Sequence, residues 1–324
     1  MPPYRPATYP AAPRILYHFY HNSEFRIPNF NYALRITNYA LFMSSLSSRT
    51  KGRIYILLTA LLWGLAGVCV KSIPWSPFCI MAARCAISMV VVAIGRRSLK
   101  LRVNRRTFFG AVAESLTGIL YMSAIKLTTA ATAIVLQYTA PVLVFLFTVV
   151  AKKKKPRLSQ ALITLLVFGG CALSFADDLA PGNLLGNILG LLSGVTFAAQ
   201  IIAFSDEKAD AGSGMILSNL LSFLFCVPFF FFDQNLDFSG RTLFWVLILG
   251  VFQYGLANLF FSRGCPLLEE TETSLLLTVE PIFNPIPVWL VTGEKPGPLA
   301  LVGFAAVIAG VTAHTVAEGR KKES

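Results

Sequence analysis

Long apolar runs, each of about twenty residues, follow one another from residue 54 to residue 317 and are separated by short polar connections. A run of about 20 apolar residues forms a helix long enough to cross a hydrocarbon layer about 30 Å thick. We predict one membrane-spanning helix for each of ten runs: 54–72, 77–95, 107–126, 129–150, 158–176, 184–205, 214–232, 242–262, 272–291 and 298–317. The pattern therefore predicts an all-α integral membrane protein with ten transmembrane helices.

The composition agrees with this prediction and excludes an ordinary soluble globule. Hydrophobic residues make up 55% of the 324 residues, and charged residues make up only 14%. Soluble domains carry about 25% charged residues. The mean hydropathy of +0.63 is correspondingly high.

The net charge of +12 is explained by where the basic residues stand. They gather after the second and fourth predicted spans and in the C-terminal tail, at 96–106, 152–157 and 320–322. Basic residues accumulate on the cytoplasmic side of membrane proteins. We therefore predict a multi-pass protein of the plasma (inner) membrane with both termini in the cytoplasm, and we expect no nucleic-acid partner.

Residues 1–48 form an N-terminal extension that is rich in Pro, Tyr and Asn. A short basic leader, MSSLSSRTKGR, begins at Met43, directly before the first predicted span. We expect residues 1–42 to be disordered or, if translation starts near Met43, to be missing from the native protein. Residues 318–324 are expected to form a cytoplasmic tail.

The two halves of the chain resemble each other. When APVLVFLFTVVAKKKKPRLSQALITLLVFGGCAL at 140–173 is placed over EPIFNPIPVWLVTGEKPGPLALVGFAAVIAGVTA at 280–313, Pro141 aligns with Pro281. We assign one five-helix repeat to 53–176 and a second to 183–317. Five is an odd number, so the second repeat enters the membrane in the opposite orientation. Carriers built from inverted repeats bind their substrate near the midplane, beside broken helices.

Prolines interrupt two of the predicted spans. Pro141 lies in the fourth span, and Pro281 and Pro285 lie in the ninth. A proline inside a helix removes a backbone hydrogen bond and clashes with the preceding turn. Within a membrane such breaks persist where protein or a water-filled cavity covers the freed backbone groups. We therefore predict that both spans border a cavity.

Three ionisable residues lie deep within predicted spans: Arg84 in the second, Glu114 in the third and Glu280 in the ninth. Such a group costs on the order of 2.5–3.5 kcal/mol in a membrane, so it needs a partner or water. In one interpretation an acid binds a proton or a substrate ammonium group, and Arg84 holds a substrate carboxylate or the second acid. In the other, a static Arg–Glu pair fastens the second span to the third.

Polar and aromatic residues at similar depths are candidates for the lining of the cavity, because rings and amides can contact a cationic or zwitterionic solute. These candidates are Trp63, Tyr121, Gln137, Tyr138, Gln253, Tyr254, Asn258 and Asn284. Each can equally serve in packing or in hydrogen bonds between helices. Gly186, Gly190 and Gly194 form a stripe on the sixth span, which permits close packing within the chain or between two copies in a homodimer.

Four segments of the chain together resemble a known family of membrane proteins. LLTALLWGLAGVCVK opens the first span, MAARCAI in the second contains Arg84, APVLVFLF lies in the fourth, and EPIFNPIPVWLVTGEKPGPLALVGFAAVIAGV covers the ninth and tenth. Over about 53–317 the chain resembles the drug/metabolite transporter superfamily, in particular its EamA-type ten-span transporters. The resemblance implies transport, often export, of a small organic solute such as an amino acid, a sugar or another metabolite.

We predict a secondary active transporter that exports an amino-acid-like metabolite by alternating access, driven by a proton gradient or by exchange. No P-loop is present, so ATP is not expected to drive it from within this chain. The cysteines and histidines form no metal-binding pattern, and we expect no cofactor and no enzymatic activity. The alternative is a cation channel or facilitator of related fold, which would need rings of acids or carbonyls along a pore. The expected partners are a small-molecule solute and the lipid bilayer.

Overall fold

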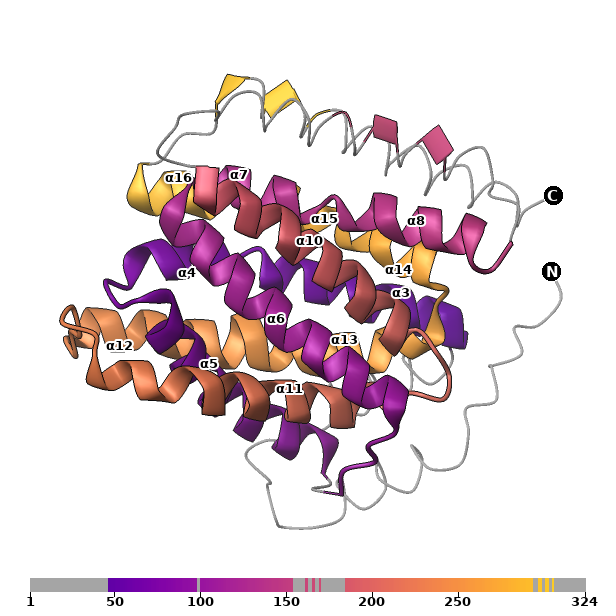
Figure 1. Cartoon of the computed structure of the whole chain (residues 1–324), viewed down its shortest axis with the longest axis horizontal. Coiled ribbons are helices and arrows are strands. Elements are labelled where there is room, and N and C mark those ends of the chain that lie inside the picture. The colour runs from indigo at the N-terminus through magenta and orange to yellow at the C-terminus, as the bar shows by residue number, and fades with distance from the viewer. Residues whose placement is uncertain are drawn as a thin grey trace, which may run out of the picture. The chain divides into compact units, whose positions relative to one another are not determined.

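The computed structural model describes residues 46–97, 100–153 and 184–293, together with 161, 162, 165, 166, 169, 297, 298, 301, 302 and 305. The chain divides into two units, Met1–Ser47 and Ser48–Ser324, and the helices of Figure 1 belong to the second. Every regular element among the described residues is a helix.

Eight helical segments of the described residues are long and apolar enough to cross a membrane, and each corresponds to a predicted span. They are Ser48–Ser72, Pro77–Arg96, Arg105–Leu127, Ala130–Val150, Leu184–Phe204, Ala211–Phe231, Gly240–Leu267 and Glu270–Thr292. The spans predicted at 158–176 and 298–317 lie almost entirely outside the described residues, as do residues 1–42 and the tail at 318–324. Ten helices and the inverted repeat therefore stay predictions.

Four of the eight spans run without interruption. They are α5 (Pro77–Arg96), α6 (Arg105–Leu127), α10 (Leu184–Phe204) and α11 (Ala211–Cys226), the last continued by the short 3-10 helix η2 (Val227–Phe231). Side chains of Ser76, Asn104 and Asp210 accept hydrogen bonds from backbone N–H groups in the first turns of α5, α6 and α11. Such caps satisfy donors that have no partner within the helix.

The other four spans are interrupted. The first consists of α3 (Ser48–Trp63) and α4 (Ala66–Ser72), and the fourth of α7 (Ala130–Gln137) and α8 (Ala140–Val150). In the numbering of the ten predicted spans, the eighth consists of α12 (Gly240–Leu247), the π-helix η3 (Ile248–Leu256), α13 (Ala257–Gly264) and η4 (Cys265–Leu267). The ninth consists of α14 (Glu270–Leu277), α15 (Val279–Phe283) and α16 (Pro285–Thr292).

The prolines of the fourth and ninth spans lie just after the interruptions. Pro141 lies in the first turn of α8, Pro281 follows the break at Thr278, and α16 begins at Pro285. This order is what the proline ring imposes, because the ring clashes with the turn that precedes it.

Side chains of the protein satisfy carbonyl groups at the breaks. The amide of Gln253 donates to the carbonyl oxygen of Trp63 over 3.3 Å, where α3 ends. The hydroxyl of Tyr138 donates to the carbonyl oxygen of Leu277 over 2.6 Å, where α14 ends. Polar groups at these breaks are therefore shielded by protein, as a membrane-embedded backbone requires.

The glycine stripe of α10 packs inside the chain. A Cβ atom at Gly186 would lie 2.8 Å from the carbonyl carbon of Leu127, and one at Gly194 would overlap the hydroxyl of Thr139. The stripe thus lets α10 approach the end of α6 and the break between α7 and α8. Of the two roles predicted for the stripe, the structure shows packing within the chain.

Ion pairs gather at the end of the bundle where α3 and α14 begin, which we call the basic end. Glu272 accepts hydrogen bonds from Arg49 over 2.5 Å and from Arg53 over 2.6 Å. Lys152 lies 2.9 Å from Glu270, which ties the end of α8 to the start of α14. Further pairs of the basic end are Arg96–Asp210 and Arg106–Asp206.

At the opposite end, the connection between α4 and α5 is bonded to the connection between η2 and α12. The indole N–H of Trp75 donates to the carbonyl oxygen of Asp237 over 2.8 Å, and the backbone N–H of Ser76 donates to Asp233 over 2.6 Å. Burial opposes ionisation of Asp233, but backbone N–H bonds from Ser76 and Asn235 hold the pKa of that carboxyl below its ordinary value of 3.8.

Candidate functional site

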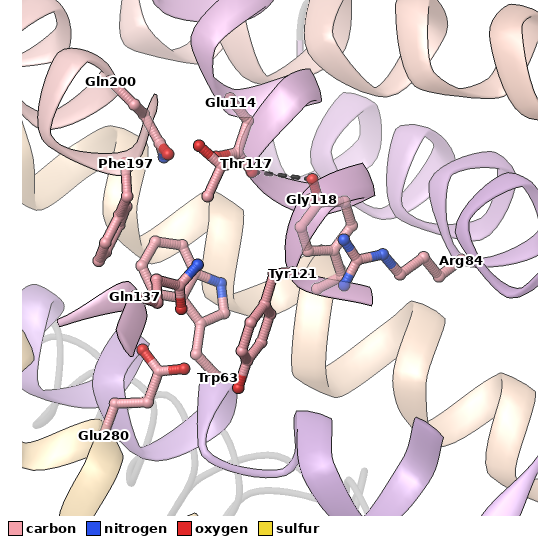
Figure 2. Close-up of a pocket in the computed structure, with 11 residues that line it drawn as sticks. Trp63, Arg84, Glu114, Thr117, Gly118, Tyr121, Gln137, Phe197, Gln200 and Glu280 are labelled. Carbon is pink, nitrogen blue, oxygen red and sulfur yellow. Dashed lines mark hydrogen bonds between the residues drawn. The ribbon is translucent and has the colours of Figure 1, made fainter. Parts of the chain in front are cut away.

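A cavity of about 40 Å³ lies among seven of the described spans. Figure 2 shows side chains from several elements directed toward this common space. The cavity is lined by Trp63, Arg84, Glu114, Thr117, Gly118, Tyr121, Gln137, Phe197, Gln200, Tyr254 and Glu280. A volume of this size has room for a few water-sized groups.

The interrupted spans supply four of these side chains. Trp63 is the last residue of α3, and Gln137 is the last residue of α7. Tyr254 lies in the π-helix η3, and Glu280 lies in α15, directly after the break at Thr278. Wide turns and breaks of this kind are frequent at functional sites of helical proteins. In this chain they bring polar side chains of different spans to one cavity.

The structure brings all three deep ionisable residues to the cavity. Glu114 is 3% exposed and accepts a hydrogen bond of 2.8 Å from the hydroxyl of Tyr254. The guanidinium of Arg84 lies over the ring of the same tyrosine, with Cζ 3.9 Å from the ring centroid. Tyr254 therefore stands between the cation and the acid, and no direct Arg84–Glu114 ion pair forms among the described residues.

The guanidinium of Arg84 is closely packed. Its side chain is 2% exposed, and Nε and Nη2 donate to the sulfur of Met81 over 3.1 and 2.9 Å. A Cβ atom at Gly118 would lie 2.7 Å from Nη2, so only glycine leaves the guanidinium its present place. A thioether is a weak acceptor. Within the described residues the positive charge therefore faces an aromatic ring and a sulfur rather than a carboxylate.

Glu280 is held by a tyrosine in the same way as Glu114. The hydroxyl of Tyr138 lies 2.7 Å from the Glu280 carboxylate and 2.6 Å from the carbonyl oxygen of Leu277. Tyr138 follows the last residue of α7, and Glu280 follows the break between α14 and α15. The two broken spans are thus joined through an acid and a phenol, with Glu280 3% exposed.

Four of the residues predicted to line the cavity do not line it: Tyr138, Gln253, Asn258 and Asn284. They lie behind the lining residues and form hydrogen bonds with them. The indole of Trp63 donates to Asn258 over 3.3 Å, and the amide of Asn284 lies 3.5 Å from the hydroxyl of Tyr121. Their bonds orient the rings that face the cavity.

The structure adds four lining residues that the sequence pattern did not single out: Thr117, Gly118, Phe197 and Gln200. The hydroxyl of Thr117 donates to that of Thr196 over 2.8 Å and thereby joins α6 to α10. Phe197 packs edge-on against Trp63, with ring centroids 5.7 Å apart. A glutamine inside the apolar run at 184–205 was the signal available for Gln200.

Within the described part of the chain, no three His, Cys, Asp or Glu residues lie close enough together to hold a metal ion. The chemistry that the cavity offers consists of one cation, two acids, two amides and several aromatic faces.

Comparisons with known proteins give a family and a fold. The EamA-like transporter family matches residues 50–176 and 182–315. The chain is 24% identical to "Uncharacterized transporter YwfM" of Bacillus subtilis (strain 168) over an alignment of 288 residues, and the alignment covers 84% of this chain and 97% of that protein. One solved crystal structure is 18% identical in sequence and superposes with a TM-score of 0.67; the match covers 85% of this chain and 100% of the other chain. At this identity the likeness shows a shared fold alone.

Proposed function

This chain belongs to the EamA-like transporter family, and from that premise we propose that it is a secondary active carrier that exports a small amino-acid-like solute. The family and the transporter relative make the chain a multi-pass membrane transporter of the drug/metabolite transporter superfamily. Membership of a transporter family also suggests that it is not an enzyme. The identity of the substrate, the coupling to a proton gradient and the direction of transport are part of what we propose. So are the location in the plasma membrane, the cytoplasmic position of both termini and the assembly into a homodimer.

The observation that carries the proposal is a pair of bonds that cross between the two predicted halves. Glu114 of the first half accepts from Tyr254 of the second, and Glu280 of the second half is bonded to Tyr138 of the first. Carriers with inverted repeats alternate their access by moving one half against the other. These bonds must therefore change when the halves move.

The same bonds give a physical route for proton coupling. A phenol donates a stronger, charge-assisted hydrogen bond to a carboxylate than to a neutral carboxyl group. At Glu280 the single hydroxyl proton of Tyr138 lies within bonding distance of two acceptors, the charged carboxylate and the carbonyl oxygen of Leu277. Protonation of Glu280 removes the charge-assisted bond: Tyr138 then donates to Leu277, and the carboxyl group of Glu280 donates to Tyr138. Loss of the proton reverses this exchange. In this mechanism the acid links the proton gradient to the conformational cycle.

The lining of the cavity favours a zwitterion. Arg84 offers a buried positive charge that faces no carboxylate among the described residues, and Glu114 and Glu280 offer negative charge. An α-amino acid presents a carboxylate and an ammonium group that complement these charges. A phosphate ester would call for more arginine or lysine than the single cation of the lining. We assign the substrate carboxylate to Arg84, the ammonium group to Glu114 and the coupling proton to Glu280.

The ion pairs of the basic end support a state that is closed on that side. Arg49 and Arg53 of α3 and Lys152 after α8 hold the start of α14 through Glu272 and Glu270. The positive-inside rule assigns the basic end to the cytoplasm. Opening toward the cytoplasm then requires these pairs to separate.

Counterflow in proteoliposomes tests the proposed function. Purified protein is reconstituted with unlabelled amino acids inside, and uptake of a labelled amino acid is followed across a panel of side chains, with protein-free liposomes as the control. A carrier accelerates labelled uptake when unlabelled solute is trapped inside, and the uptake saturates. Flux that neither saturates nor responds to trapped solute would contradict the carrier and fit a channel.

A further inference from the structure

The side chain of Gln200 differs from the other amides near the cavity. It is completely buried on α10, it lines the cavity, and neither its Nε2 nor its Oε1 has a hydrogen-bond partner. Gln253, Asn258 and Asn284 each use one atom of the amide in a bond to a neighbour. Among the described residues, Gln200 is the amide whose two polar atoms are both fully buried and without a partner.

An unpartnered amide of this kind is expensive. A buried donor or acceptor without a partner loses its bonds to water and gains none in return, and Gln200 has one of each. Buried polar groups in native proteins nearly always have partners, so an exception calls for an explanation. Gln200 adjoins the cavity, and a group that enters the cavity can supply both partners at once.

We propose that Gln200 forms the subsite that recognises the side chain of the substrate, and that this side chain is a carboxamide or ureido group. The proposal rests on the carrier function proposed above and names its substrate class: neutral amino acids of the glutamine or citrulline type. The amide of Gln200 presents a donor and an acceptor in one plane. A second planar amide satisfies both atoms, since it offers an acceptor and a donor side by side.

Other substrate groups leave one or both atoms of Gln200 unsatisfied. A carboxylate on the substrate side chain only accepts hydrogen bonds, so it can bond Nε2 of Gln200 but leaves Oε1 next to a negative oxygen. An ammonium group only donates, so it can bond Oε1 but leaves Nε2 unpaired. An apolar side chain of the same length, such as that of methionine, satisfies neither atom. The pairing therefore discriminates by hydrogen bonding and not by size.

The surroundings of Gln200 suit such a subsite. Phe197 precedes Gln200 by three residues on α10 and packs against Trp63, so apolar rings adjoin the amide. The bond between Thr117 and Thr196 fixes this part of α10 to α6. Figure 2 shows Gln200 and Arg84 on opposite sides of the drawn cavity residues, with the amide and the guanidinium both directed inward. A whole amino acid needs more room than the cavity of about 40 Å³ provides, so the solute contacts Arg84 and Gln200 together in a conformation with a wider cavity.

Competition in the counterflow assay tests the proposal. Labelled glutamine is the substrate, and unlabelled glutamine, citrulline, methionine, glutamate and lysine compete with it. The wild type should prefer glutamine to methionine by at least about 100-fold, because a site built to bond a polar group strongly rejects an analogue that lacks it. Gln200→Met, which keeps the length but not the bonds, should remove most of this preference. Gln200→Glu should shift the competition from glutamine toward lysine.

The outcomes separate this proposal from the proposed function. Counterflow in the wild type without preference for glutamine over methionine overturns the carboxamide subsite and needs no variant. Equal losses for all competitors in Gln200→Met also overturn it, since a structural or water-bonded amide gives that result. The absence of counterflow with every amino acid, in protein that is folded by thermal unfolding, overturns the carrier and the subsite together.

Discussion

Glu272 connects the start of α14 to the start of α3 at the basic end, and its replacement by glutamine should open that end more often. The carboxylate is 9% exposed and is bonded to two arginines that are 45% and 30% exposed. Glu272→Gln removes the charge but keeps the shape. Both arginines stay half in solvent and leave no buried charge without a partner, so the fold should persist.

The expected size of the effect follows from this partial burial. Exposed ion pairs contribute about 0.2–1 kcal/mol, and the removal of one partner from a fully buried pair costs about 3–5 kcal/mol. A buried acid bonded to two half-exposed arginines lies between these limits, at about 1–2 kcal/mol. If the pair exists only in the closed state, the open population rises roughly 5- to 30-fold.

A cysteine of the protein itself reports the opening. Cys265 is buried in η4, between α13 and α14, and its thiol lies 3.2 Å from the hydroxyl of Ser205 at the basic end. Its modification by a membrane-impermeant maleimide, applied to the basic side and located by mass spectrometry, measures the open population. Glu207→Gln, which removes an exposed carboxylate from the connection between α10 and α11, is the matched control.

Labelling of Cys265 in Glu272→Gln should rise 5- to 30-fold or so over the wild type, while Glu207→Gln changes it less than about twofold. Equal labelling of Glu272→Gln and Glu207→Gln would refute the assignment of this pair as a closure of the basic end.

Three further predictions concern the cavity and the opposite end. Tyr138→Phe and Tyr254→Phe each delete a hydroxyl that is bonded to an acid. A hydrogen bond to a charged group contributes about 1.5–3 kcal/mol, so gradient-driven transport should fall at least about tenfold, while the helical content measured by circular dichroism is unchanged. Gly118→Ala places a methyl group where the Arg84 guanidinium lies; the half-saturating solute concentration should rise about tenfold, and an unchanged value would contradict the carboxylate site. Because the pKa of Asp233 is lowered in the folded state, its stabilisation is complete above pH 3.8 and is lost as the pH falls through the lowered pKa. The free energy of unfolding of Asp233→Asn, measured by thermal unfolding, should therefore be lower than that of the wild type at pH 7, by less than about 1 kcal/mol. At low pH the two free energies should be equal.

The prolines and the deep charges are the sequence features from which the interrupted spans and a shared cavity could be predicted. Pro141 and Pro281 restrict the backbone wherever they stand, so the interruptions of the fourth and ninth spans could be expected from the sequence. Arg84, Glu114 and Glu280 are costly in lipid, so a shared polar environment could be expected for them. The structure places these three charges around one cavity.

The parts that could not be predicted depend on packing. The eighth span contains no proline at 242–262, and its pattern indicated a regular helix, yet residues Ile248–Leu256 form a π-helix that carries Tyr254. Its wide turn fits against α5, where a Cβ at Gly250 would lie 2.7 Å from Ile87. The side of α10 that faces the cavity is likewise set by the close approach of its glycines to α6 and α7. Periodicity alone did not reveal it, and Gln200 was therefore missed.

The most direct test of the account is proton-driven accumulation in proteoliposomes of wild type and Glu280→Gln, with Glu207→Gln as the charge-matched control. The account predicts that wild type and Glu207→Gln accumulate solute under an imposed pH gradient and show saturable counterflow. Glu280→Gln should retain counterflow and lose the accumulation, because its amide cannot gain or lose the coupling proton. Accumulation by Glu280→Gln equal to that of the wild type would contradict the assignment of Glu280 as the coupling acid between the two halves.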